Sequence, residues 1–278
     1  MHQNLIRCLQ DVTLCHISCG EQTRSESKNS VSHWVDYCRA FQIADIFPQS
    51  AALKAMVEGV ETPYLVPIDG DMILDQNAGE RIANAIWNHQ FDKSWYNIVF
   101  HLRDCLSERN ILALKIIRTE YLSENFYSDC SIPDVDFHHR MVNKGLHVVT
   151  RYLKQPPIGR HDVRGDKFCY SRYFEIYNKL LQMGEVWDPG IFPLGADPVK
   201  NFWSDTKAFV ARYMEEESRD DYLWCIAGMI DAFLQQSSQN KSKDLSIFNP
   251  KTTKDTALQT LVRMKEHLTD ILLTSSVD

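Results

Sequence analysis

The chain has 278 residues, of which 44% are hydrophobic and 24% are charged, and its formal net charge is −7. This composition is typical of a globular protein, and the acidic balance argues against a broad surface for nucleic acid. No stretch approaches the roughly 20 apolar residues that a membrane-spanning helix requires. The N-terminal segment also lacks the apolar core of a signal peptide, so we expect a cytoplasmic protein. The eight cysteines are scattered along the chain, which indicates reduced thiols instead of a disulfide framework.

The first half of the chain alternates between strand-like and helix-like segments. A strand is expected at "DVTLCHISCG" (11–20), followed by a polar loop over 21–30 and then a helix. Further strands are expected at 42–47, 62–68, 95–102, 111–122 and 146–153, and helices at 31–41, 50–60, 78–90 and 135–145. Because strands and helices alternate in this way, the sequence predicts an α/β fold with a largely parallel sheet.

The second half begins with a loop rich in proline, glycine and basic residues, at 154–167. Helical patterns follow at 168–184, 205–236 and 255–273. The aromatic residues of the first of these helices recur at helical spacing, which favours a packing role. We therefore expect an α/β domain over 1–185 and a helical C-terminal extension over 186–278, whose helices could support a homo-oligomer.

Two carboxylates lie at the end of the expected strand 62–68, in the triplet Asp69-Gly70-Asp71. In open parallel sheets, ligands collect at the carboxyl ends of the strands. The alternation of an extended segment points both side chains the same way, and Gly70 permits close approach of the backbone. Such a pair can hold Mg²⁺ or Mn²⁺, and the ion can in turn bridge a diphosphate. The alternative interpretation is a solvated turn between two strands.

The segment "ALKAMVEGVETPYLVPIDGDMIL" (52–74) resembles the core of nucleotide-sugar glycosyltransferases of the GT-A fold, and is most similar to the family 2 type. In that family a helix precedes a strand that ends in Asp-x-Asp. The resemblance covers residues 11–180 and implies a Rossmann-like, mostly parallel sheet flanked by helices. It also implies that Asp71 binds a Mn²⁺ or Mg²⁺ ion directly, and that Asp69 lies near the ribose or the metal.

Two early segments extend the resemblance toward the nucleotide. "VTLCHISCGE" (12–21) resembles the opening strand of the family, which implies that Ser18, Glu21 and Arg24 lie near the nucleotide. The next strand ends at Asp45, where the family often uses an acid for the nucleobase.

Two later segments resemble the family's acceptor and metal elements. "IPDVDFHHRMVNKGLHVV" (132–149) resembles the element that carries the catalytic base, with Asp134 at the base position and Asp136 at the following acid. Pro133 replaces the first acid of that element, so both aspartates remain candidates, and Asp134 could instead cap a helix. "IGRHDVRGDKFCYSRYFEIY" (158–177) resembles the loop with a late histidine, which implies that His161 is a third metal ligand. The alternative for His161 is a surface-loop histidine.

The resemblance therefore implies metal-dependent, inverting transfer of a sugar from a nucleotide-diphosphate sugar to a hydroxyl group of a glycan, lipid or protein. The metal would act as a Lewis acid on the leaving diphosphate. Asp134 or Asp136 would take the proton of the acceptor. Three basic residues would close over the diphosphate: Arg160, Arg164 and Lys167.

Three alternatives compete with this prediction. A non-catalytic scaffold protein with the same fold is favoured by the proline at position 133. A phosphatase of the haloacid dehalogenase type would use the first aspartate as a nucleophile, but that motif usually lies on the first strand and continues with Gly-Thr. A nucleotidyltransferase of related fold would need a glycine-rich phosphate loop after the first strand, which this sequence lacks.

Overall fold

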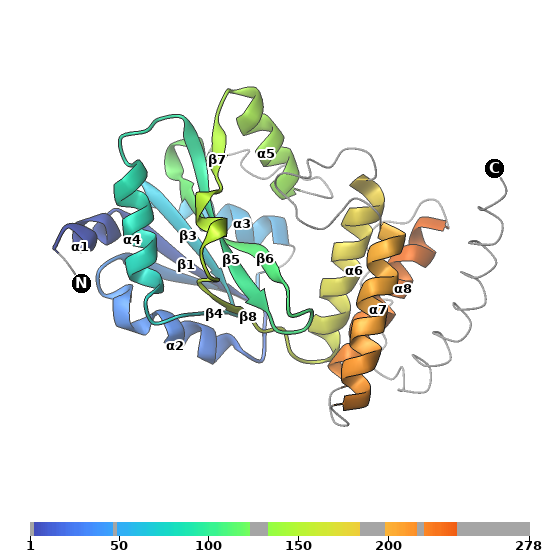
Figure 1. Cartoon of the computed structure of the whole chain (residues 1–278). Helices are drawn as coiled ribbons and strands as arrows, with labels where there is room; N and C mark the ends of the chain where they lie inside the picture. Colours follow the sequence, from blue (N-terminus) through green and yellow to red (C-terminus); the bar gives the residue numbers. More distant parts are fainter. Residues whose placement is uncertain (1–2, 47–48, 123–132, 184–197, 216–219, 238–278) are drawn as a thin grey trace. The chain divides into compact units, whose positions relative to one another are not determined.

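The computed structural model describes residues 3–46, 49–122, 133–183, 198–215 and 220–237. They divide into two compact units, Met1–Val163 and Arg164–Asp278. The first unit is an α/β sheet with helices on both faces, and the second is helical (Figure 1). The boundary expected from the sequence, between residues 185 and 186, lies outside the described residues and stays a prediction.

Eight described strands form one sheet in the order β2-β1-β3-β6-β5-β8-β4, with β7 beside β5. β1 runs parallel to β2 and β3, and β5 runs parallel to β7 and β8. β6 is antiparallel to both of its neighbours, and β4 is antiparallel to β8. The strands are β1 Val12–Ser18, β2 Arg39–Ala44, β3 Tyr64–Asp69, β4 Met72–Leu74, β5 Trp95–Asp104, β6 Asn110–Arg118, β7 His147–Val149 and β8 Gly159–His161. The predicted α/β class with a mostly parallel sheet is confirmed.

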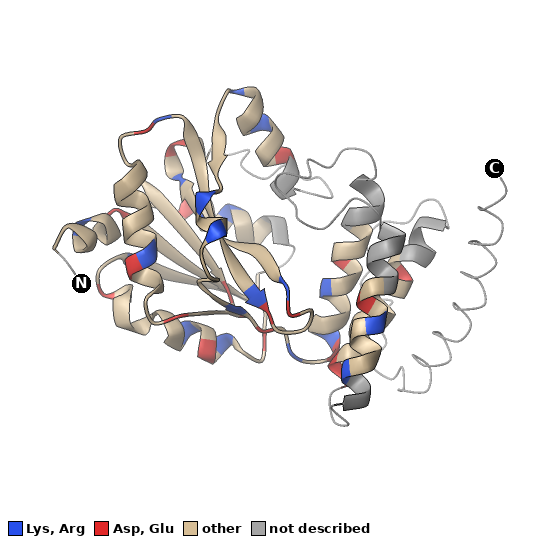
Figure 2. Cartoon of the chain, in the orientation of Figure 1, with Lys and Arg blue, Asp and Glu red and all other residues tan. Residues whose placement is uncertain are grey.

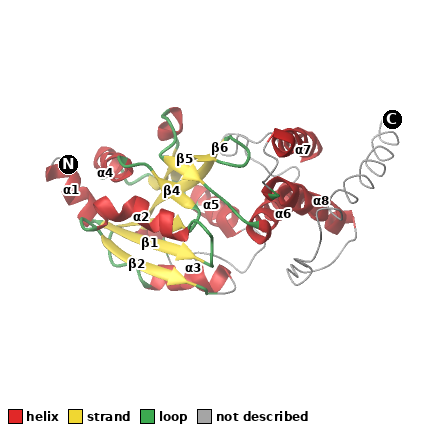
Figure 3. Cartoon of the chain, turned by 90° about the horizontal axis from the view of Figure 1, so that it is seen from below, coloured by secondary structure: helices red, strands yellow, loops and turns green. Residues whose placement is uncertain are grey.

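Helices cover both faces of the sheet because the strands are apolar on both sides. Alternation along β1 sends Val12 and Leu14 to one hydrophobic core and Cys15 to the other. The first core includes residues of α1 (Gln3–Gln10), α2 (Arg24–Val35) and α4 (Ala78–His89). The second includes residues of α3 (Gln49–Glu58) and α5 (Pro133–Asn143). Figure 3 shows α2 and α3 on opposite sides of β1 and β2.

Several sequence predictions about local structure were wrong. Residues from Arg24 onward form α2, where a polar loop was expected up to residue 30. Only Ser27, Val31 and Trp34 of this helix are buried, and a serine in the apolar repeat conceals its helical period. The helix α1 was not predicted. The strand expected over 146–153 is shorter, because β7 gives way to a 3₁₀ turn, η2 (Arg151–Lys154).

The second unit contains α6 (Asp166–Met183), α7 (Pro198–Glu215) and α8 (Asp221–Ser237). The predicted packing role of the α6 aromatics is confirmed, since Tyr170, Tyr173, Phe174 and Tyr177 are all buried. The rings of Tyr173 and Phe209 meet edge to face, with their centroids 4.9 Å apart. The helix expected over 255–273 lies outside the described residues. In the described chain, no helix is both long enough and apolar enough to cross a membrane.

One glycine of the first unit provides a test of the packing between α2 and α4. A Cβ atom at Gly79 would lie 2.6 Å from Cγ of Trp34, whose side chain is fully buried. Helix propensity alone predicts that Gly79→Ala stabilises α4. We expect the reverse, a loss of about 1–3 kcal/mol in the free energy of unfolding, because the core is overpacked. Urea unfolding measures this loss, with the exposed α4 variant Asn88→Ala as the control. A Gly79→Ala protein as stable as the control would contradict the close packing.

Candidate functional site

The acidic pair lies where the chain turns from β3 into β4. β3 ends at Asp69 and β4 begins at Met72, so Gly70 and Asp71 form the connection. β4 pairs with β8 such that Met72 lies opposite His161. The backbone N–H of Asp162 donates to the carbonyl oxygen of Asp71 at 2.8 Å, which extends the pairing by one step. This register brings Asp71 and His161 together from distant parts of the sequence.

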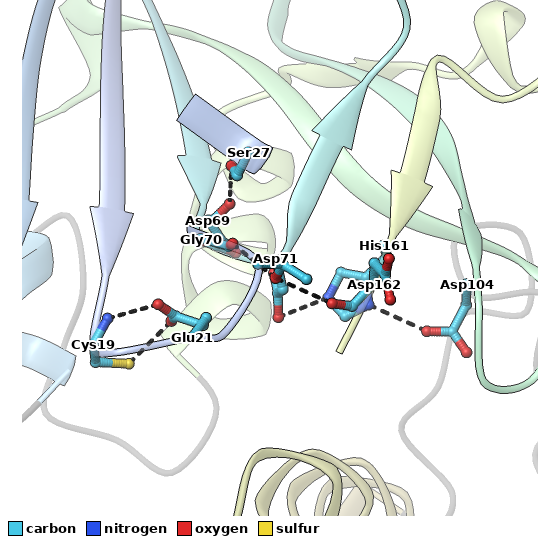
Figure 4. Close-up of polar contacts among 10 residues, drawn as sticks. Cys19, Glu21, Ser27, Asp69, Gly70, Asp71, Asp104, His161 and Asp162 are labelled. Carbon is cyan, nitrogen blue, oxygen red and sulfur yellow. Dashed lines mark hydrogen bonds and ion pairs between the residues drawn. The ribbon is translucent and has the colours of Figure 1, made fainter. Parts of the chain in front are cut away.

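His161 lies between two carboxylates (Figure 4). Its Nε2 atom is 3.2 Å from Oδ2 of Asp71, and its Nδ1 atom is 3.2 Å from Oδ1 of Asp104. Asp104 ends β5 and lies opposite His161 in the parallel pairing of β5 with β8. Both residues are almost inaccessible to solvent, with 2% of Asp104 and 3% of His161 exposed.

The other carboxylate oxygen of Asp104 is fixed by the hairpin that follows. Its Oδ2 atom accepts hydrogen bonds from the backbone N–H of Ser107 at 2.7 Å and from the Ser107 hydroxyl at 2.6 Å. The carboxylate is therefore held from one side while its Oδ1 faces the imidazole. Such a carboxylate–histidine contact fixes the orientation of the ring and leaves the Nε2 side directed at Asp71.

The two carboxylates limit which hydrogen-bonding state of His161 can satisfy both contacts. Ionised carboxylates only accept hydrogen bonds, whereas a neutral imidazole carries one N–H. While both carboxylates are ionised, the two contacts are satisfied at once if the imidazole is protonated or if a cation lies between Nε2 and Asp71. The Asp71 side of the ring is therefore suited to a divalent cation.

The Glu21 side chain packs closely against Gly70, the middle residue of the triplet. The Glu21 carboxylate accepts from the Cys19 backbone N–H at 2.9 Å and from the Cys19 thiol at 3.2 Å. Burial and then the hydrogen bond to Glu21 raise the pKa of the Cys19 thiol to about 12, so it remains a donor at neutral pH. A Cβ atom at Gly70 would lie 2.4 Å from Oε2 of Glu21. A side chain at position 70 would therefore displace the Glu21 carboxylate from this place.

Hydroxyl groups near the start of α2 hold the backbone of the site. The Thr23 hydroxyl lies 3.1 Å from the carbonyl oxygen of Gly70 and 3.2 Å from that of Asp162. The Ser27 hydroxyl donates to the carbonyl oxygen of Asp69 at 3.0 Å. These contacts connect the start of α2 with the turn after β3 and with Asp162, which follows β8. We call this part of the sheet, around Asp69, Asp71 and His161, the acidic edge.

Two other acids, Asp71 and Glu21, lie close enough to Asp69 to affect its pKa. Burial of its carboxylate among protein atoms and then repulsion from Asp71 raise the pKa of Asp69 above its usual range, whereas His161 and Lys115 lower it. The residue still reaches solvent, which weakens the desolvation. The repulsion between the carboxylates of Asp69 and Asp71 persists in solvent, and a bound cation would relieve it.

Asp45, the acid predicted to contact the nucleobase, occupies an unusual backbone conformation. It follows β2 with a φ of +56°, and its N–H donates to the carbonyl oxygen of Ser18 at 2.9 Å. A non-glycine residue in this region is uncommon and often marks a functional position. The hydrogen bond places Asp45 beside the end of β1, where Ser18 is buried. Arg24 faces Gln42 of β2, whose amide oxygen in the favoured orientation accepts from Arg24 Nη2 at 2.6 Å.

The remaining predicted site residues have other placements. Arg160 pairs with Glu26 of α2 at 3.4 Å and with Asp162 at 3.5 Å. Asp136 pairs with Arg140 one turn along α5, at 2.9 Å. The side chain of the other candidate base, Asp134, lies outside those described. Two further basic residues belong to the second unit: Arg164 and Lys167.

The predicted metal ligands are only partly brought together. Among the described residues, the structure contains no group of three or more histidine, cysteine, aspartate or glutamate side chains arranged to hold a metal ion. Asp71 and His161 are in contact, and the part of Asp69 in such a site stays a prediction. Two protein ligands still suit Mg²⁺ or Mn²⁺ in sites where substrate phosphates and waters complete the coordination.

Sequence reasoning missed several residues of the site. Asp104 and Asp162 were not singled out, nor were the hydroxyls of Thr23, Ser27 and Ser107 or the amine of Lys115. A signal existed for Asp104, because an aspartate followed by serine three residues later at the end of a strand is typical of a turn. The contact of Asp104 with His161 depends on strand pairing and has no local signature.

Comparison with known proteins gives only structural similarities. No family model matches the chain, and no curated protein matches it. The mannosyltransferase PcManGT from Pyrobaculum calidifontis, in complex with GDP-Man and Mn²⁺, is similar at 12% identity and a TM-score of 0.43, over 94% of this chain and 87% of that chain. TarS 1-349 from S. aureus is similar at 10% identity and a TM-score of 0.35, over 81% and 82% of the two chains. Bifunctional IspDF from Campylobacter jejuni has a TM-score of 0.31 at 12% identity, over 50% and 49%. Similarity at this level does not identify an activity, which must be inferred from the side chains of the site.

The anchoring of Asp104 can be tested through stability. Asp104→Ala removes the partner of three polar groups, the backbone N–H and hydroxyl of Ser107 and the Nδ1 atom of His161, so we expect a loss of about 1–3 kcal/mol in the free energy of unfolding. Arg103→Ala, at the exposed preceding position of β5, is the control and should change stability by less than about 0.5 kcal/mol. Chemical denaturation of both variants checks this. Equal stability of the two variants would contradict the anchoring.

Proposed function

We propose that the chain is a metal-dependent glycosyltransferase of the GT-A type, related to family 2. It would transfer a sugar, with inversion, from a nucleotide-diphosphate sugar to a hydroxyl group of a glycan, lipid or protein. The observation that carries the proposal is the contact of Asp71 with His161 at the edge of the sheet, oriented by Asp104. A cytoplasmic location and a homo-oligomer formed through the C-terminal helices remain predictions.

Asp71 and His161 would hold Mn²⁺ or Mg²⁺, with Asp69 as a supporting acid. When bound, the ion supplies a Lewis acid for the charge that develops on the departing nucleoside diphosphate. Asp104 would keep the Nδ1 atom of His161 engaged, so that Nε2 stays directed at the metal. The buried position of Asp104 and His161 supports this role, because it limits competition from water for the contact.

The nucleotide would bind beside the ends of β1 and β2. We assign Ser18, Glu21, Arg24 and Asp45 to this role. The left-handed backbone of Asp45 supports the assignment, because strained backbone is commonly retained where function requires it. Arg160, Arg164 and Lys167 are proposed to contact the diphosphate, since guanidinium and ammonium groups suit phosphate oxygens.

The acceptor hydroxyl would lose its proton to Asp134 or Asp136 on α5. The ion pair of Asp136 with Arg140 favours the ionised carboxylate, which is the form that a base requires. The same ion pair also suits a structural role, and Pro133 begins α5 where a proline is favoured on structural grounds. These two observations support a second candidate function, a binding or scaffold protein with this fold and no turnover.

The metal assignment predicts a specific loss of activity. We expect the wild type to release UDP, GDP or dTDP from a matching sugar donor when Mn²⁺ is present, and to stop when EDTA is added. Asp71→Asn should lower the rate by about two orders of magnitude, as expected when a group that stabilises the transition state is lost. Asp75→Asn, at the next acid of the chain, should leave the rate nearly unchanged.

The outcomes of this screen separate the candidate functions. Full activity of Asp71→Asn would contradict the metal assignment. If the wild type is inactive with every donor but is stabilised by a nucleotide and Mn²⁺ in a thermal shift measurement, the scaffold function is favoured.

We expect Asp45 to lower the free energy of unfolding and to raise the affinity for the nucleotide. Asp45→Gly relieves the left-handed conformation and should raise the free energy of unfolding by about 1 kcal/mol, while nucleotide affinity falls. Asp45→Asn tolerates the same backbone conformation without the charge, so it should lose affinity with little change in stability. Thermal denaturation and calorimetric titration with the preferred nucleotide measure the two effects. Unchanged affinity in both variants would rule out the nucleobase contact.

A further inference from the structure

A cavity of about 460 Å³ lies away from the acidic edge, between α4 and η2. Its lining residues are Arg81, Asn84, Asn88, Arg151, Tyr152 and Gln155. None of them belongs to the site around Asp71 and His161, and the proposed transferase reaction uses none of them. The volume falls within the range of small-molecule sites in proteins.

The lining follows from the helix period of α4. Arg81, Asn84 and Asn88 are separated by three and four residues, so they share one face of the helix. The opposite face of the helix, which includes Ile82 and Ile86, is buried in the core. Arg151 and Tyr152 come from η2, and Gln155 caps the end of that turn.

Both arginines of the cavity are held in position by other groups. The guanidinium of Arg81 donates to the carbonyl oxygens of Pro157 at 2.8 Å and Pro156 at 2.6 Å. Arg151 donates to the Tyr152 hydroxyl at 2.9 Å. The guanidinium of Arg151 also lies 4.9 Å from the centre of the ring of Tyr152, which is itself buried. Donors that are fixed before a ligand arrives lose less conformational entropy on binding.

The charged residues that line the cavity are all basic. Over the described chain, basic and acidic positions are interspersed along the same elements (Figure 2). The cavity instead has two arginines and no acid among its lining residues, in a chain of net charge −7. Burial lowers the pKa of Arg81 and the nearby Asp75 opposes this shift, but Asp75 does not line the cavity. An anionic ligand is therefore favoured.

The neutral groups of the lining narrow the class of ligand. Guanidinium groups bind phosphate oxygens in a planar, two-point geometry. The amides of Asn84, Asn88 and Gln155 offer both donors and acceptors, which suits neighbouring hydroxyl groups. We propose that this cavity is a second binding site, for a phosphorylated polyol such as a sugar phosphate, either free or as a lipid headgroup. Trp87 and Phe91, exposed at 45% and 88% near the end of α4, would face a membrane in the second case.

Binding of a free sugar phosphate is tested by calorimetric titration of the full chain with glucose 6-phosphate. The titration is done in EDTA, so that metal-dependent binding at the acidic edge does not contribute. Glucose and inorganic phosphate, each tested alone, should bind more weakly. Arg151→Gln should lower the affinity for glucose 6-phosphate by about tenfold or more, because a charged donor is lost. Lys154→Gln removes one charge from the same η2 turn outside the lining and should bind as the wild type does.

The lipid form is tested by sedimentation with phosphatidylcholine vesicles that contain or lack phosphatidylinositol. Binding only to vesicles with phosphatidylinositol, lost in Arg151→Gln and kept in Lys154→Gln, supports the site with a lipid headgroup as its ligand. The proposal is overturned if neither probe binds, or if Arg151→Gln binds as tightly as the wild type. Asp71→Asn should bind both probes normally, so this result is independent of the proposed transferase activity.

Discussion

The pairing of β8 with its two neighbours is the constraint on which the acidic site depends. β8 has three residues, yet it pairs antiparallel with β4 and parallel with β5. The first register places His161 beside Asp71, and the second places it beside Asp104. A shift of one residue in either pairing would turn His161 to the other face of the sheet, because side chains alternate along a strand. The contact is thus a property of the sheet as a whole.

The electrostatics of this edge favour a positive charge from outside the chain. Asp69, Asp71 and Glu21 gather near one turn, and Gly70 leaves room for the Glu21 carboxylate. Hydrogen bonds from Thr23 and Ser27 stabilise the backbone carbonyls of the turn and do not neutralise these acids. Such an arrangement costs solvation and repulsion free energy, which a bound divalent cation would offset. For this reason we propose a binding site at this edge instead of a solvated turn.

The sequence predicted the fold class and the acidic pair, because both have local signals. Alternating strands and helices indicated the sheet, and an apolar strand ending in two acids indicated the site. It failed at α2, where Ser27 occupies a buried position of the helix, and at Asp104, whose partner His161 comes from another strand. A contact that depends on strand order and register is not visible in a single sequence. His161 was predicted from the resemblance of its sequence segment to nucleotide-sugar transferases. The strand pairing of the sheet places it against Asp71.

The most direct test of the account is the location of a bound metal. Crystals of the full chain grown with MnCl₂ and a nucleoside diphosphate can be examined by anomalous diffraction at the manganese absorption edge. The account predicts one strong peak within coordination distance, about 2.0–2.3 Å, of Oδ2 of Asp71 and Nε2 of His161. Ordered nucleotide with no manganese peak between these two atoms, or with a peak elsewhere, would contradict it.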